Sequence, residues 1–192
     1  MSEDLEEEAL SIQLEAEEKM EKSIQSIRIE FQSIRTGRAN PALLNRIHVE
    51  YYGAPTPLQQ LASISVPEPR MLVIQPFDKS ALQEIDKAIQ KSDLGIAPNN
   101  DGKVIRLNIP PLTEERRRDF VKLAKKIAEE GKVAVRNVRR DANDQIKKLE
   151  KDKHLPQDQS KDYQEQLQKL TDRFIDLLDK VALEKEAEIM EH

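Results

Sequence analysis

Two runs of apolar residues, spaced alternately by three and four, place the strongest constraint on the fold of this chain. One run lies near each end of the sequence. The members are Met20, Ile24, Ile27, Phe31 and Ile34 in the first run, and Tyr163, Leu167, Leu170, Phe174, Leu177 and Val181 in the second. This spacing puts one apolar seam along an amphipathic helix. Each run therefore predicts a helix that has to bury its seam against a partner.

A third helix is predicted between residues 113 and 152. Its apolar face consists of Ile127, Val135, Val138, Ala142, Ile146 and Leu149. Thr113 can cap its first turn, and Pro156 follows its end. Three such helices are expected to close into one bundle built from residues 1–37 and 113–192. The acidic residues 1–14 are expected to be a disordered extension or the loose first turns of a helix, and they suggest no function.

The period of the apolar pattern changes to two after residue 40. Ile47, Val49 and Tyr51 alternate with polar or exposed positions, which predicts a half-buried strand. The remaining elements are expected as strands near residues 61–66, 71–75 and 104–109 and a helix over residues 80–93. Residues 38–112 therefore predict a small α+β domain, mostly β, inserted between the first two helices of the bundle. The predicted fold class is α+β.

Two short connectors, residues 36–41 and 109–113, join the predicted domain to the predicted bundle. Glycine and proline interrupt the helical pattern in the first connector, and two prolines stiffen the second. Movement between domains is the default unless a large apolar interface prevents it. We expect a two-stranded hinge formed by Thr36, Gly37, Arg38, Pro110 and Pro111.

The charge of the chain is distributed unevenly. The formal net charge is −5, which by itself argues against a nucleic-acid partner. Residues 1–22 hold nine acidic and two basic residues (net −7), residues 113–153 hold nine and fourteen (net +5), and residues 160–192 hold nine and five (net −4). One basic element can thus bind a polyanion locally while the acidic parts repel non-specific contacts.

Basic side chains crowd one face of the predicted helix of residues 113–152. At 100° per residue this face lies about 130° from the apolar face. We call it the basic stripe, and its members are Lys132, Arg136, Arg139, Arg140, Asn143 and Lys147. A solvated surface is the ordinary interpretation of such a run. Because the acidic residues lie elsewhere on the helix, and because the planar guanidinium suits phosphate oxygens and base edges, we interpret the stripe as an RNA-binding face.

Composition excludes several classes of protein. Charged residues make up 35% of the chain and aromatic residues 4%, which favours long amphipathic helices over a large β-sandwich. The sequence has no cysteine, which removes disulfides, thiolate metal sites and a cysteine nucleophile. No apolar run approaches the roughly 20 residues needed to span a membrane, and the acidic N-terminus resembles no signal or transit peptide. We expect a soluble protein without a membrane partner.

The sequence contains only incomplete matches to catalytic motifs. The three histidines are His48, His154 and His192. None of them has a carboxylate or another histidine at metal-ligand spacing. Gly102-Lys103 lacks the other residues of a phosphate-binding loop, since Ala97 and Val104 occupy positions where that motif needs glycine and serine or threonine. We therefore expect no enzyme, no cofactor and no metal.

Five segments carry a resemblance to a known family. They are residues 34–39 (IRTGRA), 49–53 (VEYYG), 55–58 (PTPL), 110–117 (PPLTEERR) and 133–142 (VAVRNVRRDA). Together, and in this order, they resemble ribosome recycling factors. The likeness extends over residues 17–192, and only the acidic start is longer than the family's usual one.

This resemblance implies an L-like protein in which a three-helix bundle carries a smaller α+β domain. It also implies a monomer that binds the 70S-type ribosome after termination through large-subunit rRNA. Such factors act with elongation factor G and GTP to separate the subunits, and GTP hydrolysis belongs to the elongation factor. The family's rRNA-contacting arginines map onto Arg136, Arg139 and Arg140. The implied compartment is the bacterial cytoplasm or the stroma of a plastid.

Two alternatives belong to other classes. A coiled-coil adaptor would bind a protein through its seams, and it predicts self-association or helical partners with little dependence on salt. The ribosome interpretation predicts a monomer whose binding weakens steeply with salt. A hydrolase with a pair of carboxylates is the third alternative, and nothing in the sequence suggests the closed, dry site that would perturb carboxylate pKa values.

Overall fold

The computed structural model describes residues 2–191. The described residues divide into two compact units. One comprises residues 2–31 and 121–187, and the other comprises residues 32–120 and 188–191. The first is helical and the second is mostly β, so the predicted α+β class is confirmed. None of the helices in the described range is both long and apolar enough to cross a membrane.

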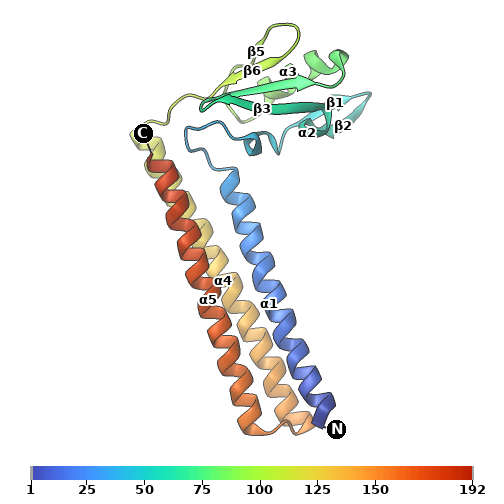
Figure 1. The fold of residues 1–192 in the computed structure, drawn as a ribbon, viewed down its shortest axis with the longest axis vertical. Helices are drawn as coiled ribbons and strands as arrows, with labels where there is room; N and C mark the ends of the chain where they lie inside the picture. Colours follow the sequence, from blue (N-terminus) through green and yellow to red (C-terminus); the bar gives the residue numbers. More distant parts are fainter. Residues whose placement is uncertain (1, 192) are drawn as a thin grey trace. The chain divides into compact units, whose positions relative to one another are not determined.

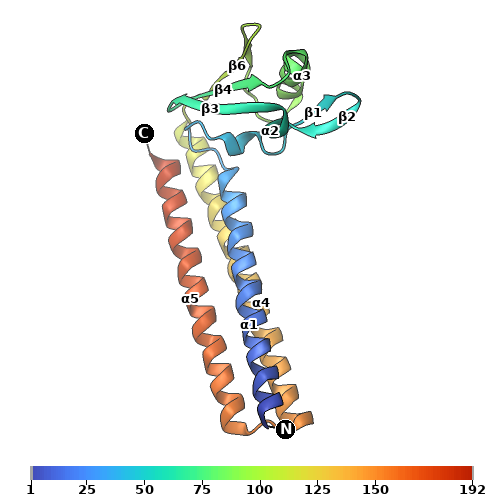
Figure 2. The ribbon, with the colours of Figure 1, turned by 45° about the vertical axis from the view of Figure 1, so that its right-hand side comes forward.

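The first unit is a bundle of three long helices, α1 (Ser2–Gln32), α4 (Glu114–Lys153) and α5 (Gln157–Met190). The helices lie side by side in both views, and α4 runs opposite to the other two (Figures 1 and 2). The connection between α4 and α5 contains His154, which adopts a positive φ of 60°, and the buried Leu155. The predicted three-helix bundle is confirmed.

The predicted seams form the core of this bundle. Met20, Ile24, Ile27 and Phe31 of α1 are all buried. On α4 the predicted apolar face is buried except for Val138, which is half-buried. The seams therefore pack against one another within one chain, and this packing removes the apolar surface that the coiled-coil adaptor alternative requires.

The three helices meet at Gly131, near the middle of α4. A Cβ atom added to this glycine would lie 2.9 Å from Cγ1 of Ile27 on α1 and 3.3 Å from Cδ2 of Leu178 on α5. Side chains from both neighbouring helices thus fill the space that a larger residue would need. Glycine is a poor helix former, so we attribute its presence in the middle of α4 to the lack of space for a side chain between α1 and α5.

Of the two alternatives predicted for residues 1–14, the described residues form the first turns of a helix and not a disordered extension, because α1 begins at Ser2. Ala9 and Ala16 are fully or almost fully buried. They pack in a cluster with Ile146, Leu149, Leu155 and others at the end of the bundle where α4 and α5 connect. Small residues at helical spacing carry a weak apolar signal, and the surrounding acidic residues obscured it.

The predicted seam of α5 is wrong in its second half. Leu178 and Ala182 are buried, whereas Leu177 and Val181 are only half-buried. A strict alternation of three and four residues assumes a period of 3.5, while a straight α-helix has 3.6 residues per turn. The buried face therefore moves by one residue after Phe174.

The second unit contains an antiparallel sheet of four strands in the order β3-β4-β6-β5 and a separate hairpin of β1 and β2. The strands are β1 (His48–Tyr51), β2 (Ala54–Pro57), β3 (Ala62–Glu68), β4 (Met71–Pro76), β5 (Asn99–Asn100) and β6 (Ile105–Asn108). The helices are η1 (Pro41–Leu44), α2 (Leu58–Leu61), η2 (Lys79–Ala81) and α3 (Leu82–Lys91). Apart from short elements, these match the predicted strands and helix.

The core of this unit lies between α3 and the strands. Leu82, Ile85 and Ile89 of α3 are buried, and they share a cluster with residues of β1, β4 and β6. The pattern did not predict β2, because its prolines indicated the end of a strand. Proline is tolerated on an edge strand, and β2 pairs with β1 alone.

Asp101 closes the turn between β5 and β6. Its Oδ1 accepts hydrogen bonds from the backbone N–H groups of Lys103 (2.9 Å) and Val104 (2.8 Å). Its Oδ2 accepts one from Nη1 of Arg106 at 2.6 Å. The backbone bond from Val104 and the bond from Arg106 hold the pKa of Asp101 well below its usual value. The Asp101 carboxylate therefore stabilises the turn.

Candidate nucleic-acid interface

The basic stripe lies on α4, which is one unbroken helix of 40 residues, or about 60 Å at 1.5 Å per residue. Thr113 caps its start, since its Oγ1 accepts a hydrogen bond from the backbone N–H of Arg116 at 3.2 Å. Glu114 and Glu115 occupy the first turn, where negative charge opposes the positive end of the helix dipole. The helix therefore presents its cations on a rigid line.

Lys132 does not belong to the outward part of the stripe, and this prediction is wrong. Its ammonium group pairs with Asp179 of α5 and, at 3.2 Å, with Glu129. Only 15% of its side chain is exposed. The hydrogen bond to Asp179 raises the pKa of Lys132. The helical pattern placed Lys132 away from the apolar face correctly, but it could not show that α5 covers this flank of α4.

Arg139 also lies closer to α5 than predicted. It is half-buried rather than fully outward, and its Nη1 donates to Oε1 of Gln168 on α5 at 3.2 Å. Nε of Arg139 and Oδ1 of Asn143 are buried and have no hydrogen-bond partner in the described structure. A buried donor without a partner is costly. Because both atoms are buried, neither is open to a ligand with the side chains in this arrangement.

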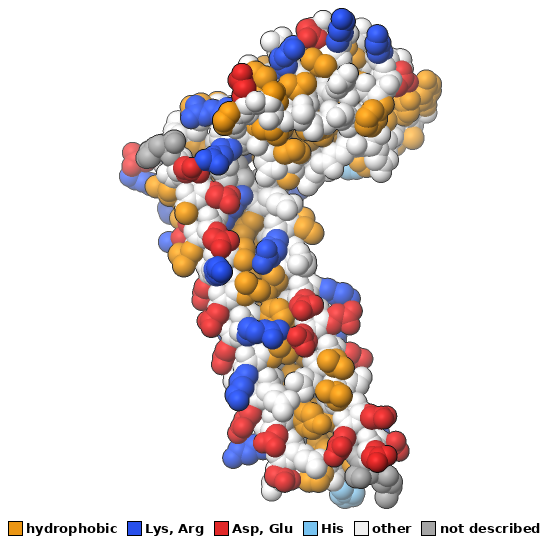
Figure 3. Space-filling model, viewed as in Figure 1, with side chains coloured by type: hydrophobic (Ala, Val, Ile, Leu, Met, Phe, Trp, Pro, Cys, Tyr) orange, Lys and Arg blue, Asp and Glu red, His pale blue; other side chains and the backbone are white. Residues whose placement is uncertain are grey.

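Four cations of the stripe have no acidic partner within ion-pair distance among the described residues, namely Arg136, Arg139, Arg140 and Lys147. Arg140 and Lys147 are exposed, and Arg136 is half-buried. On the face drawn in Figure 3, by contrast, acidic and basic side chains are interspersed along the helices. Unpaired cations on a fixed line are suited to a phosphate backbone.

Two exposed lysines, which were not predicted as members of the stripe, extend it towards the start of α4. Lys122 precedes Arg140 by 18 residues, which is five helical turns, so both side chains leave the helix in the same direction. Lys122 and Lys125 are exposed. The periodicity that defined the stripe could have found them had it been continued across Gly131.

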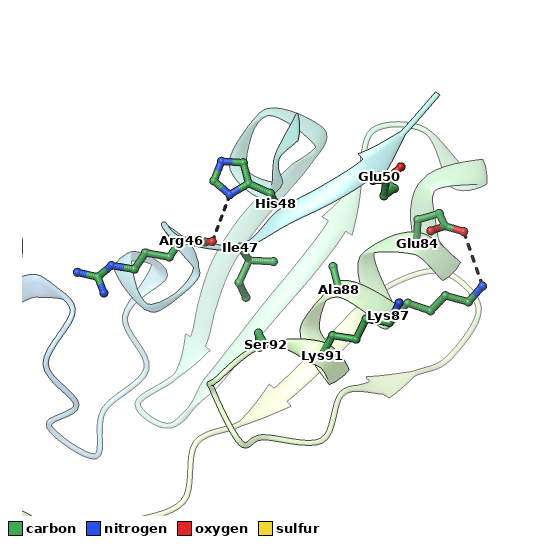
Figure 4. A pocket seen from close by; sticks show the side chains of 9 residues that line it. All are labelled: Arg46, Ile47, His48, Glu50, Glu84, Lys87, Ala88, Lys91 and Ser92. Carbon is green, nitrogen blue, oxygen red and sulfur yellow. Dashed lines mark hydrogen bonds and ion pairs between the residues drawn. The ribbon is translucent and has the colours of Figure 1, made fainter. Parts of the chain in front are cut away.

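A second group of cations surrounds a hollow of about 280 Å³ between β1 and α3 (Figure 4). Arg46, Lys87 and Lys91 lie on its rim together with Glu50 and Glu84. Lys87 pairs with Glu84 at 3.7 Å. The mixed charges of this hollow fit a solvated surface, and they do not form a row of unpaired cations like that on α4.

Catalytic groups do not converge in the part of the chain that the structure describes. No three potential metal ligands lie together among residues 2–191. His48 and His154 are exposed, and His192 lies outside the described residues. Tyr51 donates its hydroxyl to Asp78 at 2.9 Å; this bond raises the pKa of Tyr51, and bonds from Ser80 lower that of Asp78. The pair joins the β1–β2 hairpin to the segment after β4.

The residues predicted as a hinge come together within the second unit. Gly37 has a φ of +82°, and a Cβ added there would lie 3.6 Å from the backbone nitrogen of Leu112. A hollow of about 150 Å³ is lined by Thr36, Gly37, Arg38 and Pro111, among others. Arg38 forms an ion pair with Glu191. The structure places the two connectors beside each other, and their role as a hinge stays a prediction.

A three-helix bundle with an inserted α+β domain, and with unpaired cations along one helix, defines a binding protein that acts through its surface. The sequence pattern described as "Ribosome recycling factor" matches residues 27–190. The chain belongs to the ribosome recycling factor family. Members of this family are translation factors and not enzymes.

Relatives cover almost the whole chain. The ribosome-recycling factor of Brevibacillus brevis is 61% identical over 175 residues, which are 91% of this chain and 95% of the relative. That of Halalkalibacterium halodurans is 62% identical over 177 residues, with 92% and 96% covered.

Two solved structures share the fold. A solution structure of ribosome recycling factor has a TM-score of 0.75 and 47% identity and covers 95% of this chain and 97% of its own. Another describes the T. thermophilus factor and the E. coli elongation factor G bound to the E. coli post-termination complex. It has a TM-score of 0.66 and 48% identity, and it covers 95% of this chain and 99% of its own.

Proposed function

We propose that this chain binds the post-termination 70S-type ribosome through the outward cations of α4. With elongation factor G and GTP, it then promotes separation of the subunits as a monomer. The family supports the process, since a related factor has been described together with elongation factor G on a post-termination complex. The observation that carries the choice of surface is the line of unpaired cations Arg136, Arg140 and Lys147 on a rigid helix.

Arg139 is the most specific member of this proposed rRNA contact. Its guanidinium group is half-buried beside α5 and has no acidic partner among the described residues, so its outward N–H groups would donate charge-assisted hydrogen bonds to a phosphate oxygen. Lysine has no planar fork and would replace this contact only in part. The RNA-binding residues that we propose are therefore Arg136, Arg139, Arg140, Asn143 and Lys147.

The test is co-sedimentation of Arg139→Ala with 70S ribosomes over a series of salt concentrations. We expect weaker binding and a salt slope smaller by about one contact, together with slower subunit separation by elongation factor G and GTP. The loss of the bond to Gln168 should lower the free energy of unfolding by only about 0.5–1.5 kcal/mol. Arg139→Lys should recover part of the affinity.

Two control variants separate binding from structure. Gln168→Ala removes the same hydrogen bond from α5 but keeps the guanidinium group, so it should still bind ribosomes. Lys148→Ala removes an exposed cation about 100° away from Lys147 on the same helix, and it should leave the salt slope unchanged. Normal subunit separation by a folded Arg139→Ala protein would show that the rRNA contact is assigned to the wrong residue.

We also propose that the protein works in a bacterial cytoplasm. The relatives named above come from bacteria, and a further one from Prochlorococcus marinus is 58% identical over 176 residues. A plastid stroma is the alternative. Immunolocalisation in the source organism distinguishes the two.

A further inference from the structure

The flank of α4 that lies against α5 holds two cations in contrasting contacts. Lys132 pairs with the carboxylate of Asp179 and, at 3.2 Å, with that of Glu129. Two turns further along α4, Nη1 of Arg139 donates to the amide oxygen Oε1 of Gln168 at 3.2 Å. The charge of Lys132 is thus compensated by acidic residues, whereas Arg139 is held by an uncharged group.

Gln168 is itself held by another residue of α5. Its Nε2 donates to Oδ1 of Asp172, one helical turn further on, at 2.9 Å. A carboxylate only accepts hydrogen bonds and a guanidinium group only donates them, so a single orientation of the amide satisfies both neighbours. The amide oxygen therefore faces Arg139, and the amide nitrogen faces Asp172. This chain of hydrogen bonds fixes the direction of the guanidinium group without an ion pair to any described residue.

An uncharged acceptor keeps the charge of Arg139 available to a ligand. Each cation that binds a phosphate backbone releases counterions and adds about 0.7–0.9 units to the salt slope. An arginine that is already paired with a carboxylate loses much of this gain, because the ligand has to displace the acidic partner. An amide acceptor leaves the full charge and still restricts the long side chain before binding, which reduces the entropy lost on binding.

We propose that Gln168 and Asp172 are positioning residues of the rRNA contact. Gln168 holds the guanidinium group of Arg139 in one direction with its charge uncompensated, and Asp172 orients the Gln168 amide. Both residues act through Arg139 and not by contact with the RNA. The uncharged side chain at position 168 is what distinguishes Arg139 from Lys132. The inference rests on the proposed function of Arg139 as a phosphate-binding residue.

Gln168→Glu converts the contact of Arg139 into the kind that Lys132 makes. The change replaces an amide by a carboxylate of the same shape, so Arg139 gains an acidic partner. Binding to 70S ribosomes, measured by co-sedimentation over a series of salt concentrations, should weaken about tenfold. The salt slope should fall by about one contact, as in Arg139→Ala. The melting temperature should change little, because the new ion pair offsets the repulsion from Asp172.

Three further variants separate local pairing from net charge. Gln168→Glu/Asp172→Asn moves the carboxylate from position 172 to position 168 at constant net charge, and it should lose the same contact as Gln168→Glu. Gln166→Glu adds the same charge at an exposed position about 160° away around α5, and it should keep the parent's salt slope. Gln168→Ala leaves Arg139 without an acidic partner, so the slope should persist while the affinity falls only about two- to threefold.

Arg139→Ala, measured in the same series, shows which proposal has failed. A lost contact in Arg139→Ala together with an unchanged salt slope in Gln168→Glu would overturn the positioning role and leave the rRNA contact intact. An unchanged slope in both variants would overturn the rRNA contact of Arg139 and the positioning role with it. A slope that falls equally in Gln166→Glu would reveal an effect of net charge alone, which would also overturn the positioning role.

Discussion

Replacing Gly131 by alanine sets two known effects against each other. Alanine is favoured over glycine in a helix by about 1 kcal/mol. The added Cβ would lie 2.9 Å from Cγ1 of Ile27 and 3.3 Å from Cδ2 of Leu178, and overpacking of this kind costs typically about 1–3 kcal/mol. Because a β-branched isoleucine is stiff at χ1, Cγ1 cannot turn aside without a shift of the backbone. Overpacking should prevail, and Gly131→Ala should destabilise the protein by about 1 kcal/mol.

The measurement is urea unfolding followed by far-ultraviolet circular dichroism, at equal protein concentration for each variant. The same change is also measured in an Ile27→Ala background, which removes Cγ1 and Cδ1, the two isoleucine atoms close to the added Cβ. In that background the same Gly131→Ala change should be less destabilising than in the unchanged chain, because only the approach to Cδ2 of Leu178 at 3.3 Å remains to oppose the gain in helix propensity. Gly131→Leu should be far worse than Gly131→Ala in either background. Stabilisation by Gly131→Ala in the unchanged chain would refute the close approach of the three helices.

Phe174→Ala should lower the free energy of unfolding by about 3–5 kcal/mol, since Phe174 is buried in the bundle; a midpoint within error of the parent would show that this seam is misassigned. The folded pKa of Asp101 is depressed, so its stabilising contribution is complete above the unfolded pKa of about 4 and is lost as the pH falls below that value. Asp101→Asn should therefore reduce the difference between urea midpoints measured at pH 6 and pH 3, and an unchanged difference would contradict the role of the carboxylate. Spin labels at the positions of His48 and Gln168 should report a broad distance distribution that changes on ribosome binding, and a single unchanged distance would exclude the proposed hinge.

The apolar periodicity was sufficient to predict the bundle and most of the strands. Ile27 and Phe31 are buried where the spacing predicted, because a helix turns every apolar residue at that spacing to one side. The periodicity could not show which flank of α4 is covered by α5. Lys132 and Arg139 were therefore predicted to face outward, whereas the structure places them against Asp179 and Gln168 respectively.

Local backbone chemistry explains the other differences. The prolines of β2 indicated a strand end, although an edge strand tolerates them. Tyr52 carried no turn signal, because aromatic residues rarely adopt a positive φ. Its two-residue turn became visible only in the structure.

The order of the elements along the chain has a consequence for synthesis. All residues of the inserted domain's core lie between Leu44 and Ile109, so that core can form as soon as this stretch has left the ribosome. The partners of α1 on α5, such as Leu178 near Ile27, come about 150 residues later, a delay of roughly 7 to 30 s at 5–20 residues per second. The apolar face of α4 emerges earlier in this time, and until α5 follows, the seam of α1 is covered by α4 alone and is open to other apolar surfaces. The nascent chain is therefore most vulnerable to aggregation at its N-terminal helix, after the inserted domain has folded and before α5 has emerged.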